Sequence, residues 1–185
     1  SDKDDLLLTG GLNYYCIIKW GEKISSKDTF GFNNDYLCFL PFDPQNPNDG
    51  LLWVNHEYID PLFVSGFNNK IHSNFENHRT KDQVDKEMYN VGGSIIRIKE
   101  IDGKWKVIQD DPLNRRITGK TPIKLNWDFP IKGKTSVIGT HSNCSGGITP
   151  WKTFLSCEEN YDQFYGETLY NSDGSYQHVE SYFGW

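Results

Sequence analysis

The stretch SIIRIKEIDGKWKVIQD, residues 94–110, decides the fold class of this chain. Apolar and polar residues alternate on both sides of Asp102-Gly103, a dipeptide that tolerates positive φ and favours a two-residue hairpin turn. Such period-2 alternation is typical of strands with one buried face. The stretch therefore predicts a β-hairpin that turns at Asp102-Gly103.

Short apolar or alternating runs recur along the rest of the chain. Clusters of Gly, Pro, Asn or Asp separate them and supply the turns that strands need. We expect a mainly β fold, either a propeller or a sandwich, because no internal repeat decides between the two. The expected strands are residues 14–20, 36–42, 51–58, 94–101, 104–110, 136–141 and 153–160.

One helix is expected, in RTKDQVDKEMYN at residues 79–90, which is dense in helix formers. The residues before it are polar and irregular. We therefore expect one domain over residues 1–185, with an insertion loop and a short surface helix at 67–90. The closing run HVESYFGW stops at Trp185 as if inside a strand, so we expect this domain to be incomplete.

Composition limits the partners of the chain. Its net charge is −6, which disfavours duplex nucleic acid and anionic membrane surfaces, because both require a basic face. No run of 18 apolar residues occurs, so no transmembrane segment is expected. Metal cations fit the acidic balance, since Asp and Glu supply the oxygen ligands that they need.

A cysteine and two glutamates stand side by side in TFLSCEEN, where a strand is expected to end. The thiolate of Cys157 would suit a transition metal, and the carboxylates of Glu158 and Glu159 a harder ion. A strand end can aim neighbouring side chains into one pocket. A core cysteine beside two solvated glutamates explains the same residues, so both interpretations stay open at this point.

Other motifs also carry candidate chemistry. NHE at residues 55–57 ends an apolar run, either as metal-binding side chains or as an ordinary strand end. The glycine-rich loop expected at 139–147 would let a backbone approach a bound ion closely. The adjacent Arg115 and Arg116 suit phosphate recognition, or they bridge acidic groups on the surface.

The four cysteines are widely spaced and form neither a zinc pattern nor a dense disulfide framework. Cys16 and Cys38 lie within apolar runs, where we expect small buried side chains. The spacing leaves open whether Cys144 and Cys157 are bridged.

Taken in order, several motifs resemble the N-terminal part of the PhoX-type alkaline phosphatases. They are long, colinear and chemically unusual, above all NHEY and the run that ends in CEEN. Lys152 stands where the family pattern usually has Gly. The motifs are KWGEKI (19–24), FGFNNDYLCFLPF (30–42), GLLWVNHEY (50–58), VGGSIIRI (91–98), DDPLNRRITGKTPIKL (110–125), VIGTHSNCSGGITPWKTFLSCEENY (137–161) and YFGW (182–185).

The resemblance implies a six-bladed β-propeller with a central cluster of ferric iron and calcium that hydrolyses phosphate monoesters. This chain would supply the N-terminal blades, and the remaining C-terminal part of the same propeller would be its partner. The isolated segment is expected to be inactive. The resemblance also implies an exported protein, in the periplasm, at the cell surface or outside the cell.

Site residues follow from motif positions in this resemblance. It implies metal ligands at Cys157, Glu57, Glu158 and Glu159. It also implies amides that orient these ligands or face calcium, at Asn55, Asn143 and Asn160. The catalytic side chains stay unassigned.

Two other functions remain possible on these residues. One is a noncatalytic, metal-stabilised propeller that acts as a binding or assembly module at the cell surface, because fold does not determine function. The other is a propeller enzyme that acts on sugars or lactones with calcium alone, which gives Cys157 no role. Iron content distinguishes this last class from the others.

Overall fold

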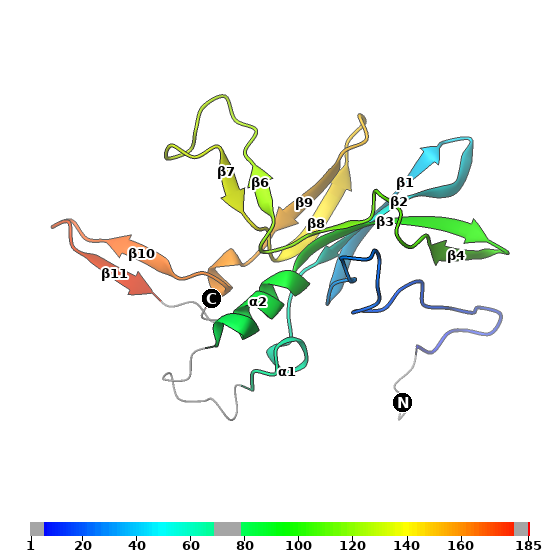
Figure 1. Cartoon of the computed structure of the whole chain (residues 1–185), viewed down its shortest axis with the longest axis horizontal. Coiled ribbons are helices and arrows are strands. Elements are labelled where there is room, and N and C mark those ends of the chain that lie inside the picture. Colours follow the sequence, from blue (N-terminus) through cyan, green and yellow to red (C-terminus); the bar gives the residue numbers. More distant parts are fainter. Residues whose placement is uncertain (1–5, 69–78, 180–184) are drawn as a thin grey trace.

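The computed structural model describes residues 6–68, 79–179 and 185, and its regular structure is mainly β (Figure 1). The strands form four antiparallel sheets that do not close on themselves within the described residues. The largest has the order β1-β2-β3-β4, with β5 also beside β3, and the others are the pairs β6–β7, β8–β9 and β10–β11. Their bounds are β1 (Asn34–Asp43), β2 (Asn46–His56), β3 (Gly92–Ile101), β4 (Lys104–Val107), β5 (Arg115–Ile117), β6 (Pro122–Lys124), β7 (Ser136–Ile138), β8 (Asn143–Ile148), β9 (Phe154–Glu158), β10 (Glu167–Tyr170) and β11 (Tyr176–Val179).

The hairpin predicted from residues 94–110 is present as β3 and β4. Ile101 pairs with Lys104 across the turn. Asp102 and Gly103 have φ values of 54° and 73°, as a turn with two positive φ angles requires.

The two faces of β2 pack against different parts of the chain, because side chains alternate along a strand. On one face, Val54 joins a buried cluster with Ile24, Phe30 and the β3 residues Ile96 and Ile98. The N-terminal segment thus covers this face of the sheet. The opposite face of β2 meets the β8–β9 sheet, where Trp53 stacks on Phe154 of β9 with ring centroids 6.0 Å apart.

The strand predicted at residues 14–20 is wrong, since this segment is irregular. In this segment the side chain of Ile18 packs against the core on one face of the sheet, and the segment does not pair with a neighbouring strand of the described residues. The expectation that Cys16 is buried is also wrong, because its side chain is exposed, while Cys38 is half-buried. All four cysteines are free.

Two α-helices of the described residues lie beside the main sheet (Figure 1), and a short 3-10 helix follows β9 at Tyr161–Gln163. Helix α1 (Pro61–Val64) was not expected from the sequence, and α2 (Lys81–Asn90) lies within the predicted helix at 79–90. Thr80 caps α2 in a capping box with Gln83, which satisfies two of the free N–H groups at the helix start. Residues 69–78 of the predicted insertion loop lie outside the described residues.

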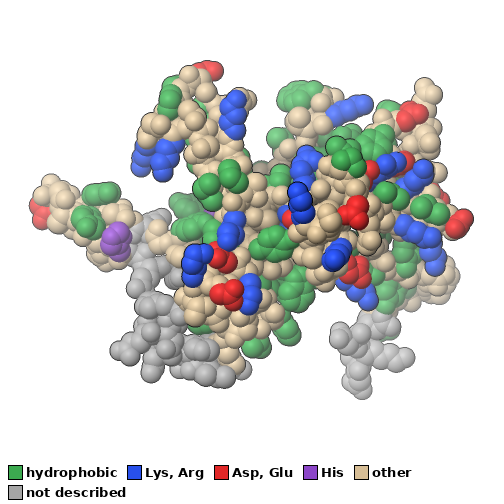
Figure 2. Space-filling view, viewed as in Figure 1, with side chains coloured by type: hydrophobic (Ala, Val, Ile, Leu, Met, Phe, Trp, Pro, Cys, Tyr) green, Lys and Arg blue, Asp and Glu red, His purple; other side chains and the backbone are tan. Residues whose placement is uncertain are grey.

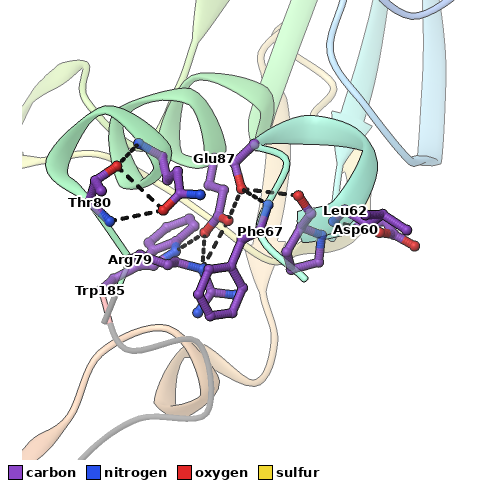
Figure 3. Close-up of polar contacts among 10 residues, drawn as sticks. Asp60, Leu62, Phe67, Arg79, Thr80, Glu87 and Trp185 are labelled. Atoms are coloured by element: carbon purple, nitrogen blue, oxygen red, sulfur yellow. Dashed lines mark hydrogen bonds and ion pairs between the residues drawn. The ribbon is translucent and has the colours of Figure 1, made fainter. Parts of the chain in front are cut away.

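A buried carboxylate on α2 joins three segments of the chain (Figure 3). Glu87 accepts hydrogen bonds from the side chains of Ser65 at 2.7 Å, Arg79 at 2.9 Å and Trp185 at 2.6 Å. The ion pair with Arg79 balances the buried charge of Glu87. Glu87 therefore holds α2 to the loop after α1 and to Trp185.

Charges of both signs are mixed on the face of the molecule shown in Figure 2. Around α2, Lys86 pairs with Asp82 and Lys120 pairs with Asp85, both at 2.7 Å. This face therefore offers no continuous basic surface of the kind that duplex nucleic acid requires. Within the described part of the chain, no helix combines the length and apolarity needed to cross a membrane.

An ion pair joins β2 to β3 beside the core. Arg97 donates two hydrogen bonds to the carboxylate of Asp49, at 2.9 and 2.7 Å, and a third to Asp111 at 2.9 Å. The hydrogen bonds from Arg97 lower the pKa of Asp49 below its ordinary value of 3.8, although burial opposes this shift. Asp49 is therefore a source of pH-dependent stability.

Replacing this carboxylate is expected to destabilise the protein at neutral pH but not at strongly acidic pH. Because the pKa of Asp49 is lower in the folded state, its contribution is present above pH 3.8 and is lost as pH falls through the folded-state pKa. Urea unfolding of wild type and Asp49→Asn at about pH 7 and about pH 3 tests this. A difference in unfolding free energy that is the same at both pH values would contradict it.

Candidate metal centre

Two carboxylates and one thiol converge at one end of the main sheet. Asp35 lies near the start of β1, Glu57 directly follows β2, and Cys144 lies on β8. Their ligand atoms all lie within 4.8 Å of one another, in the one such group of metal-ligand residue types found among residues 6–68, 79–179 and 185. Asp35 is exposed and the other two are half-buried. We refer to these residues as the Asp35–Glu57–Cys144 centre.

The pairing of β1 with β2 brings the two carboxylates to the same end of the sheet. Asn34 pairs with His56 in the antiparallel register, and the register shifts between Asn34 and Leu37, so that β1 has one extra residue beside the end of β2, where Asp35 lies. The backbone N–H of Glu57 donates to the carbonyl of Asn33 at 3.0 Å, which extends this contact past the end of β2. The positions of Asp35 and Glu57 therefore follow from strand pairing together with the irregularity in β1.

A glycine allows β8 to approach this end of the sheet. A Cβ on Gly146 would lie 2.5 Å from Cδ1 of Tyr36 on β1 and 2.6 Å from the carbonyl oxygen of Leu155 on β9. The prediction of a loop at residues 139–147 is wrong for residues 143–147, which belong to β8. The absence of a side chain at Gly146 therefore allows β8 to pack closely against β1 and β9.

Acidic groups dominate the electrostatics of the centre. Burial, followed by the negative charges of Asp35 and Glu159, raises the pKa of Glu57. Hydrogen bonds to Glu159 and Asp35 raise the pKa of the Cys144 thiol to about 12. Glu159 thus lies at the edge of the centre. A bound cation would relieve the repulsion among these groups and favour their deprotonated forms.

The structure separates the residues that the resemblance implied as ligands. Glu57 belongs to the centre and Glu159 borders it. Glu158 accepts hydrogen bonds from the hydroxyl of Thr140 at 2.8 Å and the backbone N–H of His141 at 3.2 Å. Cys157 is exposed and is not among the three residues of the centre. Metal binding by Cys157 and Glu158 stays a prediction.

Strand alternation explains the position of Cys157. Its neighbour Ser156 faces β2, where the hydroxyl of Ser156 donates to Asn55 at 2.8 Å. Adjacent side chains of a strand point to opposite faces, so Cys157 points away from β2. The adjacency of Cys157 to two glutamates favoured it in the sequence, whereas Asp35 and Cys144 were missed although both lie in motifs that carry the resemblance.

The asparagines implied by the resemblance have defined partners. Asn143 is buried and donates to the hydroxyls of Thr140 and Ser156, at 3.0 and 2.8 Å. Asn160 donates to the hydroxyl of Tyr58 at 2.7 Å and to the carboxylate of Glu159 at 3.3 Å. Asn160 therefore contacts a residue at the edge of the centre directly.

His56 lies on the opposite face of β2 from Asn55. It is fully buried, its Nε2 lies 2.7 Å from the hydroxyl of Ser94, and its ring packs edge-to-face on Phe30. Burial, and then the charge of Arg116, holds the pKa of His56 well below its ordinary value. In NHE at residues 55–57, a core histidine thus separates Asn55 from the ligand candidate Glu57.

Arg116 takes neither of the roles expected from the arginine pair. Its buried guanidinium donates to four backbone carbonyls, those of Thr29, Tyr89, Val91 and Gly93, at 3.0 to 3.1 Å. Burial lowers its pKa to about 10. Arg116 therefore joins the N-terminal segment, the end of α2 and β3.

Comparisons with known proteins agree with the motifs. The sequence model of the family described as alkaline phosphatase PhoX matches residues 1–184. Comparison with curated proteins gave no match. A solved structure of Pseudomonas fluorescens PhoX in complex with vanadate, a transition state analogue, matches with a TM-score of 0.67 and 27% sequence identity, over 81% of this chain and 29% of that one.

This chain thus corresponds to less than a third of the length of the Pseudomonas fluorescens protein. The resemblance inferred from the motifs is confirmed, since the family model covers nearly every residue. The protein belongs to the PhoX alkaline phosphatase family.

Proposed function

We propose that the protein is a metal-dependent phosphomonoesterase and that the Asp35–Glu57–Cys144 centre is part of its metal site. The observation that carries this proposal is the convergence of a thiol with two carboxylates in a chain of the PhoX family. The vanadate complex of the Pseudomonas fluorescens relative, described as a transition state analogue, supports phosphoryl transfer as the class of reaction.

The residues present fit the iron and calcium implied by the resemblance. A thiolate suits iron, and carboxylate oxygens are the ligands that calcium prefers. Burial and then acidic neighbours raise the pKa of Glu57, and acidic neighbours raise the pKa of Cys144; bound cations would balance the negative charge of these neighbours. We therefore propose Cys144 as the sulfur ligand of ferric iron and the carboxylates of Asp35 and Glu57 as ligands of iron or calcium.

The metal ions, when bound, supply positive charge that binds phosphoryl oxygens and offsets the negative charge that develops as the ester bond breaks. The residues of this chain hold that charge in place. Asp35 and Glu57 do so from adjacent strand ends, and Cys144 from a strand packed against them. Asn160 donates to Glu159 at 3.3 Å and so orients a further carboxylate at the edge of the centre.

We also propose that the described sheets are N-terminal blades of a six-bladed propeller that a further part of the same protein completes. The β6–β7 and β8–β9 hairpins project from the main sheet (Figure 1), and the exposed apolar side chains between their strands support this proposal. Trp151 is 74% exposed between β8 and β9, and Phe129 is 69% exposed between β6 and β7. Further blades would cover such surface. Export from the cytoplasm is likewise a proposal that rests on family membership.

We expect the complete protein, purified without chelators, to contain iron and calcium and to hydrolyse 4-nitrophenyl phosphate. A chelator should remove both metals and the activity together, and adding both back should restore hydrolysis, because the metal charge stabilises the transition state. Elemental analysis and release of nitrophenolate measure these outcomes.

The same measurements separate the alternatives. Iron without hydrolysis would favour the noncatalytic module at the cell surface. Calcium without iron would favour the calcium-only enzyme class, and a protein with neither metal would overturn the proposed function.

A further inference from the structure

We infer that Asn55 is a positioning residue that holds Cys144 at the metal centre, and that its amide oxygen is not a calcium ligand. This inference rests on the proposed function of the Asp35–Glu57–Cys144 centre. Asn55 is fully buried at the end of β2, on the strand face that meets β8 and β9. The resemblance alone left open whether such an amide orients ligands or faces calcium.

The nitrogen of the Asn55 amide holds the backbone of β8. Its two N–H groups donate to the carbonyl oxygens of Cys144 at 2.9 Å and Ser145 at 3.1 Å. These carbonyls belong to the residue that carries the thiol and to the residue after it. Asn55 therefore connects β2 directly to the backbone that carries the sulfur ligand.

The oxygen of the same amide already accepts two hydrogen bonds from protein side chains. It accepts hydrogen bonds from the indole N–H of Trp53 at 2.7 Å and from the hydroxyl of Ser156 at 2.8 Å. An amide oxygen has two lone pairs, so these two donors saturate it. The four contacts leave Asn55 neither a free lone pair for a metal ion nor freedom to turn its amide.

The contact restrains the geometry of the centre because Glu57 is only two residues from Asn55 along the chain. Asn55 lies at the end of β2 and Glu57 directly follows that strand. The hydrogen bond that holds the Cys144 backbone against Asn55 therefore also holds the Cys144 thiol near the Glu57 carboxylate. Outer partners of this kind fix the orientation of metal ligands, and their loss typically weakens metal binding by about 10–100-fold.

The test compares substitutions that remove the hydrogen bonds of the Asn55 amide nitrogen with one that removes a hydrogen bond of the Asn55 amide oxygen. Asn55→Asp keeps oxygen acceptors for Trp53 and Ser156 but removes the N–H donors to the two β8 carbonyls. Ser156→Ala is the matched control, because it removes one donor to the Asn55 oxygen and one acceptor of the Asn143 amide, but leaves the nitrogen contacts of Asn55 with Cys144 and Ser145 in place. Asn55→Ala is a further variant at the same position, which also removes the N–H donors to the β8 carbonyls but adds no negative charge.

Cobalt(II) titration of the complete, chelator-treated protein provides the first measurement, with the absorption of the sulfur-to-cobalt bond as its signal. We expect the cobalt Kd to rise by about 10–100-fold in Asn55→Asp and in Asn55→Ala, and to change little in Ser156→Ala. Thermal unfolding of each metal-free variant separates this effect from a loss of stability. A lower melting temperature with an unchanged cobalt Kd in both Asn55 variants would reduce Asn55 to a structural residue and overturn the inference.

Alkylation by iodoacetamide provides a measurement that does not depend on metal. Mass spectrometry follows each cysteine separately in the chelator-treated protein, with Cys38 and Cys157 as internal references. Cys144 should react severalfold faster in both Asn55 variants than in wild type or Ser156→Ala, because its backbone is no longer held against β2. If wild type shows no sulfur-to-cobalt signal, the proposed metal site fails. The alkylation rates then decide the positioning role alone, and unchanged rates at Cys144 would overturn it.

Discussion

Cys144→Ser is expected to remove iron from the protein and to lower the rate of phosphate monoester hydrolysis by more than about 100-fold. This figure is the upper end of the loss that follows when only an outer partner of a metal ligand is removed. The physical reason is the loss of the one thiolate in the centre, since a serine hydroxyl is a poor replacement for a soft sulfur ligand. The measurements are elemental analysis of iron and the rate of nitrophenolate release.

Cys157→Ser provides the matched comparison, because Cys157 lies on the next strand and is exposed. It decides between the ligand favoured by the sequence and the ligand favoured by the geometry. Loss of iron in Cys157→Ser together with retention of iron in Cys144→Ser would contradict the proposal and support the assignment from the motif. Both variants should retain the melting temperature of the metal-free protein within about 2 °C, since a stability change of about 1 kcal/mol shifts the melting temperature of a domain of this size by about 2–4 °C.

Arg116→Met is expected to lower the free energy of unfolding by about 4 kcal/mol or more. The substitution leaves four backbone carbonyl oxygens, those of Thr29, Tyr89, Val91 and Gly93, without their donor. Each buried group that loses its partner costs about 1–3 kcal/mol, although methionine also removes the cost of burying a charge. Urea unfolding monitored by tryptophan fluorescence measures the difference.

The neighbouring arginine is the control for this prediction. Arg115 is exposed, and its guanidinium donates to the carbonyl of Leu113 at 2.8 Å. Arg115→Met should therefore change the unfolding free energy by less than about 0.5 kcal/mol, as for most surface substitutions. Equal effects at Arg115 and Arg116 would show that the buried contacts of Arg116 contribute little to stability.

Local patterns predicted the elements that local chemistry controls. Asp102-Gly103 predicted its own turn because the required φ angles are a property of those two residues. The helix-forming composition of residues 79–90 located α2 for a similar reason. At Lys152, φ is 66°, a left-handed conformation that glycine adopts most easily, which explains why the family pattern usually has glycine there.

Patterns were less informative where packing decides the outcome. Residues 14–20 form an apolar run that is typical of a strand but remain irregular, because Ile18 alone packs against the core and the segment pairs with no strand of the described residues. Residues 139–147 were expected to form a glycine-rich loop, because their small side chains let a backbone approach a bound ion, yet β8 occupies residues 143–148. Gly146 is tolerated in β8 because a side chain at this position would collide with Tyr36.

The sequence by itself determined the mainly β character, the hairpin at Asp102-Gly103 and membership of the PhoX family. Only the tertiary structure decided which cysteine meets Glu57. Cys157 and Glu158 are neighbours in the chain, but strand alternation directs adjacent side chains to opposite faces. Cys144 lies 87 positions after Glu57, and the packing of β8 against β1 and β2 brings the two together. Contacts between residues so distant in the chain depend on strand register and packing, which a motif does not contain.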